Sequence, residues 1–154
     1  MVEPYYNKVK DFGMEFESDG IGTVRYLGLS LFHTQNGAYT GNILATEAAK
    51  SATLCRYIPP CLLQTVREEI CIRLGSLFNG RYRGPFGVDM MICAALNDGG
   101  ESISDKRFYL HPCVEINLRR TMGHVALALS PGDDDIRRVM RIEFNENVYK
   151  LRIR

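Results

Sequence analysis

The sequence predicts an α+β fold with a largely antiparallel sheet and flanking helices. Strand-like segments follow one another at the start, in the middle and at the end of the chain, and the helix-like segments do not alternate regularly with them. A doubly wound parallel sheet would require such alternation. The 154 residues, of which 45% are hydrophobic and 24% charged, suit one globular domain with a hydrophobic core.

Strand signals dominate the first 45 residues. Between residues 12 and 17, the apolar Phe12, Met14 and Phe16 alternate with other residues, which predicts a half-buried strand. Ser18-Asp19-Gly20 is a hairpin turn signal. Further strands are expected over 23–32 and 39–44, although the string Tyr39-Thr40-Gly41-Asn42 also fits an ordinary loop or a contact to a phosphate or an acceptor substrate.

Helices are expected next, over 45–56 and 60–78. Proline suits the first turn of the second helix, in which leucine, isoleucine and valine recur at helical spacing. The later segments are strands over 87–96 and 108–117, a short helix over 120–129 and a final hairpin formed by 139–144 and 148–153.

The two middle strands carry a candidate metal site. If they form a hairpin centred on Ser102, Asp89 lies opposite Glu115, and Asn117 shares the face of Glu115. Two opposed carboxylates repel each other unless a cation neutralises them. Two carboxylates and an amide carbonyl suit Mg²⁺ held jointly with substrate phosphates. The same spacing also fits a solvent-facing polar surface on which two acids meet.

The same register divides the remaining residues of these strands between two faces. Cys113 falls on the acidic face, where it is interpreted as an inert thiol. The other face is predicted to belong to the core and carries Val88, Met90, Ile92, Leu96, Leu110, Val114 and Ile116.

The composition excludes some classes of binding partner and indicates the cellular compartment of the protein. The formal net charge is +1, so nucleic acid is not expected as a partner. No apolar run approaches the roughly 20 residues of a membrane helix, and there is no signal-peptide pattern, so no membrane partner is expected either. The five cysteines lack CxxC spacing, which predicts reduced thiols and a cytoplasmic protein.

The segments Gly87-Val88-Asp89-Met90-Met91 and His111-Pro112-Cys113-Val114-Glu115-Ile116-Asn117-Leu118-Arg119 resemble the signature of the ATP-grasp superfamily. The resemblance implies ATP and Mg²⁺ (or Mn²⁺) as cofactors, with Asp89, Glu115 and Asn117 as metal ligands. The Asn-x-Arg extension is similar to that of carboxylase-type and amino-acid-ligase-type members, where the arginine faces the phosphate or the carboxylate substrate. Arg119 is therefore the candidate catalytic residue.

The start of the chain extends the resemblance. Val2-Glu3-Pro4-Tyr5 resembles the hinge strand that lies along the adenine and ribose, which implies Glu3 as a nucleotide-binding residue. ATP-grasp enzymes hold ATP between two subdomains, and the lysine-bearing N-terminal subdomain has no counterpart in this sequence. Residues 1–154 are therefore expected to form a single domain, the C-terminal metal-binding half of a partial ATP-grasp domain.

The resemblance implies a function for this half. It is the ATP- and Mg-binding C-terminal portion of an ATP-dependent carboxylate–amine or carboxylate–thiol ligase that acts through an acyl phosphate, with a nucleotide and a small carboxylate as partners. Without the missing N-terminal half we expect the isolated chain to be inactive and to self-associate, as a homo-oligomer, through its uncovered face. The alternative is a non-catalytic binding or assembly module that keeps the scaffold.

Overall fold

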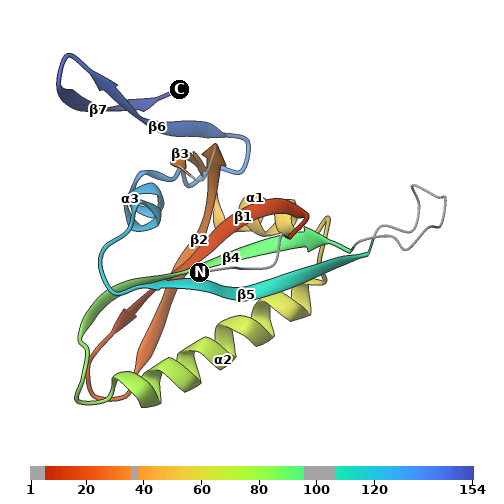
Figure 1. Cartoon of the computed structure of the whole chain (residues 1–154), viewed down its shortest axis with the longest axis vertical. Helices are drawn as coiled ribbons and strands as arrows, with labels where there is room; N and C mark the ends of the chain where they lie inside the picture. The colour runs from red at the N-terminus through yellow and green to blue at the C-terminus, as the bar shows by residue number, and fades with distance from the viewer. Residues whose placement is uncertain (1–5, 36–37, 96–106) are drawn as a thin grey trace.

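The computed structural model describes residues 6–35, 38–95 and 107–154, which form one antiparallel sheet and three helices (Figure 1). The sheet has seven strands in the order β5-β4-β1-β2-β3-β6-β7. In chain order the elements are β1 (Lys8–Ser18), β2 (Val24–Gln35), β3 (Ala38–Leu44), α1 (Glu47–Leu54), α2 (Pro60–Phe78), β4 (Gly84–Ala94), β5 (Phe108–Asn117), α3 (Met122–Leu129), β6 (Arg138–Asn145) and β7 (Val148–Ile153). The predicted α+β class with a largely antiparallel sheet is confirmed.

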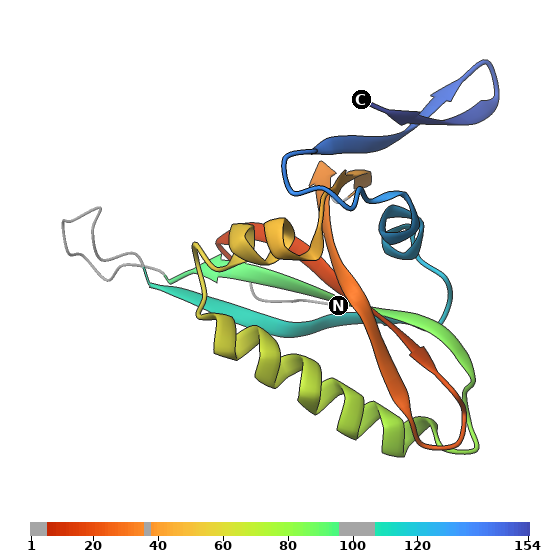
Figure 2. The same ribbon diagram turned by 180° about the vertical axis from the view of Figure 1, so that it is seen from behind.

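The main hydrophobic core lies between the sheet and α1 and α2. Helix α2 begins at Pro60 and ends at Phe78, as the sequence predicts, and it lies along one side of the sheet (Figure 2). Leu54 of α1 and Leu63 of α2 are buried against the strands. The strands contribute the alternate residues of β1, β2 and β4, namely Phe12, Met14, Phe16, Leu29, Leu31, Phe86, Val88, Met90 and Ile92.

Strand β1 is buried on both faces, so the prediction of a half-buried strand is wrong. Its second face carries Glu15, whose exposed fraction is 2%. Glu15 is paired with Gly28 on one neighbouring strand and with Gly87 on the other. A Cβ at Gly28 would lie 2.7 Å from a side-chain carbon of Leu127, so α3 packs closely on this face. The helix therefore covers a carboxylate that the local sequence places in solvent.

Strands β4 and β5 pair in the expected register only at one end. Asp89 is paired with Glu115, but Met91 is paired with His111, so three residues of β5 lie opposite one residue of β4. Proline inside this bulge cannot donate a ladder hydrogen bond, which favours an irregularity on an edge strand.

The bulge overturns the predicted faces of the residues that it contains. Cys113 does not lie on the acidic face; it lines an apolar groove against α2 instead. Val114 is 54% exposed and borders the acidic cavity, so it does not lie on the core face. Ile116, outside the bulge, keeps its predicted face: it pairs with Val88 and lines the groove against α2, although it is 38% exposed. Val88, Met90 and Ile92 are buried as predicted, and Leu96 lies outside the described residues.

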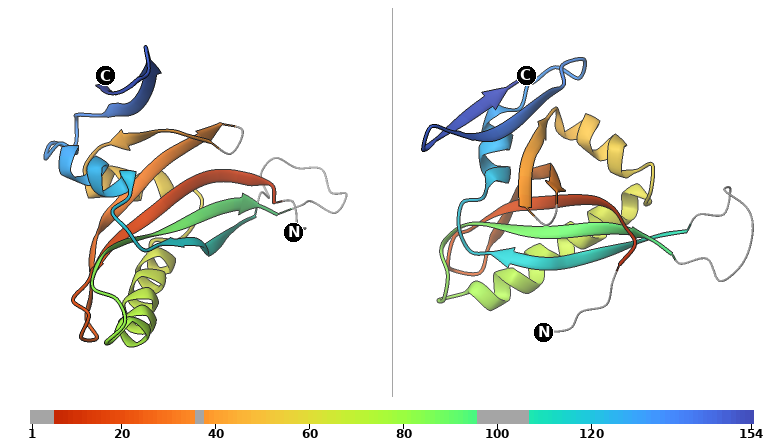
Figure 3. Two further views of the ribbon diagram at one scale, coloured as in Figure 1. Left: turned by 60° about the vertical axis from the view of Figure 1, so that its left-hand side comes forward. Right: turned by 45° about the horizontal axis from the view of Figure 1, so that its top comes forward.

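The last two strands extend the sheet beyond β3. Asn42 of β3 pairs with Met140 of β6, and the two-residue turn between β6 and β7 has Glu146 and Asn147 at positive φ, as a twisted hairpin requires. Every residue of β7 is exposed. The hairpin lies at the opposite end of the molecule from α2 (Figure 3). It therefore lies away from the residues discussed next.

Candidate functional site

A cavity of about 470 Å³ lies on the α3 side of the sheet. It extends across β5, β4, β1, β2 and β3, and it is closed at one end by the segment that leads into α3. Asp89, Glu115, Asn117 and Arg119 all line it. The four candidate residues from two distant stretches of sequence are therefore brought together, as the hairpin interpretation requires.

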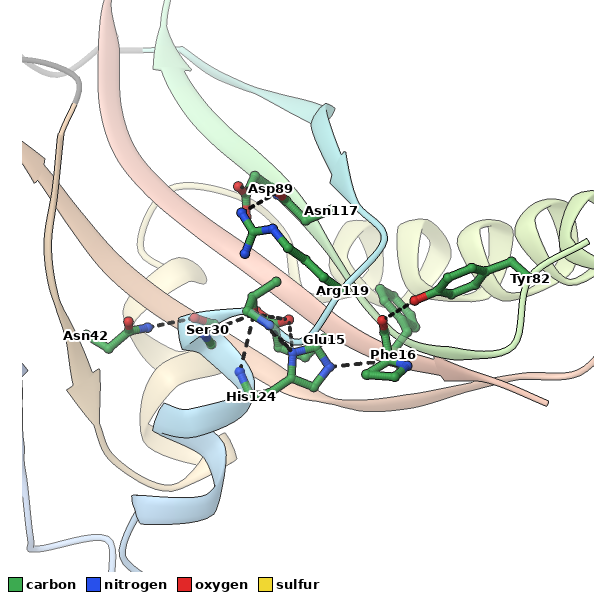
Figure 4. Close-up of polar contacts among 12 residues, drawn as sticks. Glu15, Phe16, Ser30, Asn42, Tyr82, Asp89, Asn117, Arg119 and His124 are labelled. Atoms are coloured by element: carbon green, nitrogen blue, oxygen red, sulfur yellow. Dashed lines mark hydrogen bonds and ion pairs between the residues drawn. The ribbon is translucent and has the colours of Figure 1, made fainter. Parts of the chain in front are cut away.

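Asp89 and Glu115 lie directly opposite each other on neighbouring strands. Asn117 donates from Nδ2 to Asp89 Oδ2 at 3.1 Å, and its Oδ1 accepts from Arg119 Nη2 at 3.1 Å (Figure 4). Asn117 is nearly buried, whereas Glu115 and Arg119 are exposed. The Asn117 amide therefore joins Asp89 to Arg119.

The environment of Asp89 disfavours its charge. Burial, with the nearby charges of Glu15 and Glu115, raises the pKa of Asp89 to about 6, although the Asn117 amide and Arg119 partly offset this. A raised carboxyl pKa means that a positive charge placed beside Asp89 would be strongly favoured. In the described part of the chain, neither Asp89 nor Glu115 has a cationic side chain within ion-pair distance.

Sequence reasoning missed Glu15, a further acid of this cavity. Its Oε2 accepts a hydrogen bond from Thr121 Oγ1 at 2.8 Å and lies 3.0 Å from His124 Nδ1. Burial lowers the pKa of His124, but the hydrogen bond and charge of Glu15 outweigh it, so the pKa is raised overall. His124 Nε2 lies 3.3 Å from the carbonyl oxygen of Phe16, which it can donate to. Glu15 is therefore paired internally.

Three glycines leave the space that the Glu15 carboxylate occupies. A Cβ at Gly123 would lie 1.8 Å from Glu15 Oε1, and a Cβ at Gly87 would lie 2.7 Å from Oε2. At Gly13 the corresponding distance to Oε1 is 3.4 Å. These glycines are a sequence signal for a buried side chain. The signal can be recognised only once it is known that β1, β4 and the start of α3 lie next to one another.

The charges that line the cavity divide into paired and available groups. Lys8 Nζ lies 2.6 Å from Asp11 Oδ2, and Glu15 is paired with His124. Asp89, Glu115 and Arg119 remain at the end nearest α3. This end can therefore bind a cation and an anion together.

The donor atoms around Asp89 decide whether a divalent cation fits there. Within residues 6–35, 38–95 and 107–154, no group of three or more His, Cys, Asp or Glu side chains could hold a metal ion. The candidate set has only two carboxylates, and Asn117 presents its NH₂ group, not its carbonyl, to Asp89. A half-turn of the amide would bring Oδ1 to that place. Such a set fits Mg²⁺ that takes its remaining ligands from water and phosphate.

The remaining candidate, Glu3, lies outside the described residues. No helix in the described part of the chain is long and apolar enough to span a membrane.

Comparison with solved structures identifies the architecture. The structure matches N5-carboxyaminoimidazole synthetase from Staphylococcus aureus, an ATP-grasp protein, with a TM-score of 0.51 and 14% sequence identity. The match covers 94% of this chain. The chain shares the fold of part of this ATP-grasp protein.

The ATP-grasp likeness concerns part of a larger protein, since the chain spans 37% of the synthetase's length. Two further matches are an ATP-grasp superfamily protein from Archaeoglobus fulgidus (TM-score 0.49, 18% identity, 96% of this chain and 46% of that one) and the S. aureus synthetase complexed with ADP (TM-score 0.48, 13% identity, 94% and 37%). No family model matches the sequence, and no curated protein matches it.

Proposed function

We propose that this chain is the ATP- and Mg²⁺-binding C-terminal portion of an ATP-dependent carboxylate–amine or carboxylate–thiol ligase. The observation that carries the proposal is the direct opposition of Asp89 and Glu115 on the floor of a cavity, with Arg119 beside them. The likeness to part of an ATP-grasp protein supports it. Such an arrangement of two acids is costly for the fold itself, which argues for a bound cation.

Each residue has a role in the proposal. Asp89, Glu115 and Asn117 would hold Mg²⁺ (or Mn²⁺), which supplies positive charge to the phosphates of ATP. Arg119 would bind the transferred phosphate or the substrate carboxylate through its planar guanidinium. Arg119 lies next to the metal-binding end, where its Nη2 donates to Asn117 Oδ1. The half-turn that presents Oδ1 to a cation would release the guanidinium from this hydrogen bond for the anion.

In the proposed reaction the carboxylate attacks the γ-phosphorus, ADP leaves, and an amine or thiol then displaces phosphate from the acyl phosphate. Because phosphoryl transfer needs charge stabilisation on all sides of the phosphate, we expect the lysines of a second subdomain to be required as well. Glu115 and Arg119 are exposed and act in a high dielectric. The 154-residue chain alone should therefore bind Mg-ATP only at about millimolar concentrations and turn over well below about one per second.

The proposal is tested by titrating the chain with ADP in the presence and absence of Mg²⁺, followed by NMR. We expect Mg²⁺ to strengthen binding, and Asp89→Asn to remove that gain while leaving metal-free binding unchanged. Glu143→Gln is the matched control, because Glu143 lies on β6 outside the cavity lining. If the affinity for ADP changes neither with Mg²⁺ nor in the Asp89→Asn variant, the result would favour the non-catalytic module instead.

A further inference from the structure

A straight row of residues crosses the floor of the cavity. Glu115 of β5 pairs with Asp89 of β4, Asp89 with Gly13 of β1, and Gly13 with Ser30 of β2. Residues paired in this way point to the same face of an antiparallel sheet. The acid pair and Ser30 therefore lie on one surface, with glycine between them.

Gly13 leaves the floor open at the centre of this row. A Cβ there would lie 3.2 Å from Asp89 Oδ1, so even alanine would crowd the carboxylate. Two strand spacings, about 10 Å in all, separate the positions of Asp89 and Ser30. A small molecule can thus extend over bare backbone from one side chain to the other.

The far end of the row is a buried chain of neutral hydrogen-bonding groups. Asn42 Nδ2 donates to Ser30 Oγ at 2.7 Å, and the Tyr39 hydroxyl donates to Asn42 Oδ1. Asn42 is 0% exposed and Ser30 is 2% exposed, yet both line the cavity (Figure 4). Because Asn42 fills one side of the Ser30 oxygen, the hydroxyl can direct its proton to a ligand on another side.

The remaining polar groups at this end are occupied by one another. Lys8 Nζ lies 2.6 Å from Asp11 Oδ2 and donates to Thr34 Oγ1 at 3.0 Å, while Thr34 donates to Asp11 at 2.7 Å. The ring of Phe32 also lines the cavity here. The charges of Lys8 and Asp11 cancel at this end of the cavity, whereas, among the described residues, Asp89, Glu115 and Arg119 leave unpaired charge at the other end. This end therefore suits an uncharged polar group.

We propose that the Ser30–Asn42–Tyr39 chain binds an amide or hydroxyl group on the body of the small carboxylate substrate. The inference rests on the proposed function, since the carboxylate end of that substrate would lie toward Arg119 and the metal-binding end. The expected substrates are short acids of about four carbons whose end away from the carboxylate carries a neutral hydrogen-bonding group. Purely aliphatic acids would offer no acceptor to the Ser30 hydroxyl, whose oxygen already accepts from Asn42.

The test uses two acids of similar shape, succinamate and 4-methylpentanoate, which carry an amide and an isopropyl group, respectively, at the end away from the carboxylate. Each is titrated into the 154-residue chain with Mg-ADP present, and binding is followed by NMR. We expect succinamate to bind about three- to tenfold more tightly, the worth of one net hydrogen bond. Ser30→Ala and Tyr39→Phe should each reduce that preference, and Thr53→Ala, which removes a hydroxyl on α1, should leave it unchanged.

The outcomes separate this inference from the proposed function. Normal Mg-ADP binding with equal affinity for the two acids would overturn the inference and leave the function standing. Absence of Mg²⁺-dependent ADP binding would overturn the function, and the acid preference is then measured without nucleotide. Thermal unfolding checks each variant, and Tyr39→Phe, which is only partly buried, decides the matter if Ser30→Ala does not fold.

Discussion

Glu15 Oε2 lies 3.0 Å from His124 Nδ1, and both side chains are almost fully buried beneath the candidate site. The pair links β1, at the centre of the sheet, to the first turn of α3. In its neutral form His124 can instead accept at Nδ1 from the backbone N–H of Thr121, 3.1 Å away. The contact between Glu15 and His124 therefore holds the start of α3 against β1, next to the segment that carries Arg119.

Loss of this pair should be costly. Glu15→Gln leaves the imidazole without its counter-charge in a buried place, and we expect a loss of about 3 kcal/mol in the free energy of unfolding. In a chain of this size that lowers Tm by about 6–12 °C. Glu17→Gln is the matched control, since Glu17 pairs with Arg25 on the surface and should change stability by no more than about 1 kcal/mol. Equal effects of the two substitutions, measured by calorimetry, would show that the buried pair does not stabilise the fold.

The glycine at position 123 should be indispensable for the same reason. A methyl group there would lie 1.8 Å from Glu15 Oε1, so Gly123→Ala has to displace either the carboxylate or α3. We expect it to lower stability by about 2–3 kcal/mol. Gly132→Ala provides the comparison, because a Cβ at that position meets nothing within 4 Å. A stable Gly123→Ala protein, with a Tm within a degree or so of the parent, would contradict the packing described for Glu15.

Local signals were sufficient for the elements and for the acid pair. Helix α2 is marked by Pro60 at its start and by apolar residues at helical spacing, both of which lie within the helix. The pairing of Asp89 with Glu115 follows from the centre of one hairpin. Neither depends on distant parts of the chain, so both could be predicted.

Non-local contacts explain what the sequence did not reveal. Glu15 is buried because Gly28, Gly87 and α3 come together around it from three separate parts of the chain. The exchange of faces by Cys113 and Val114 depends on the bulge, which simple alternation cannot indicate. Tyr39 and Asn42, for which a loop was an open interpretation, lie in strand β3 and line the cavity.

Two aspartates of the same cavity should respond in opposite ways to the same change. Asp89→Asn removes a carboxylate whose charge the fold disfavours, so we expect Tm at neutral pH to be unchanged or higher. Asp11→Asn removes an acid that accepts from Lys8 and Thr34, and it should lower stability by about 1 kcal/mol. Thermal unfolding of both variants without added metal makes the comparison. A clear fall in Tm for Asp89→Asn would show that the Asp89 carboxylate stabilises the fold without a bound cation, contrary to this prediction.

Mg²⁺ binding should depend on pH through Asp89. A metal ligand has to be deprotonated, and burial together with the charges of Glu15 and Glu115 raises the pKa of Asp89 to about 6. The unfolded value lies near 3.8, so the folded protein holds this proton to a higher pH than a free aspartate does. Mg²⁺ has to displace that proton below about pH 6, and its apparent affinity should fall about tenfold for each further pH unit, whereas above about pH 7 it should level off. Isothermal titration of Mg-ADP across this range measures the effect, with metal-free ADP as the reference. If Asp89 is a ligand, the same decline should be absent in Asp89→Asn; an identical pH profile in that variant would assign the proton, and the cation, to another group.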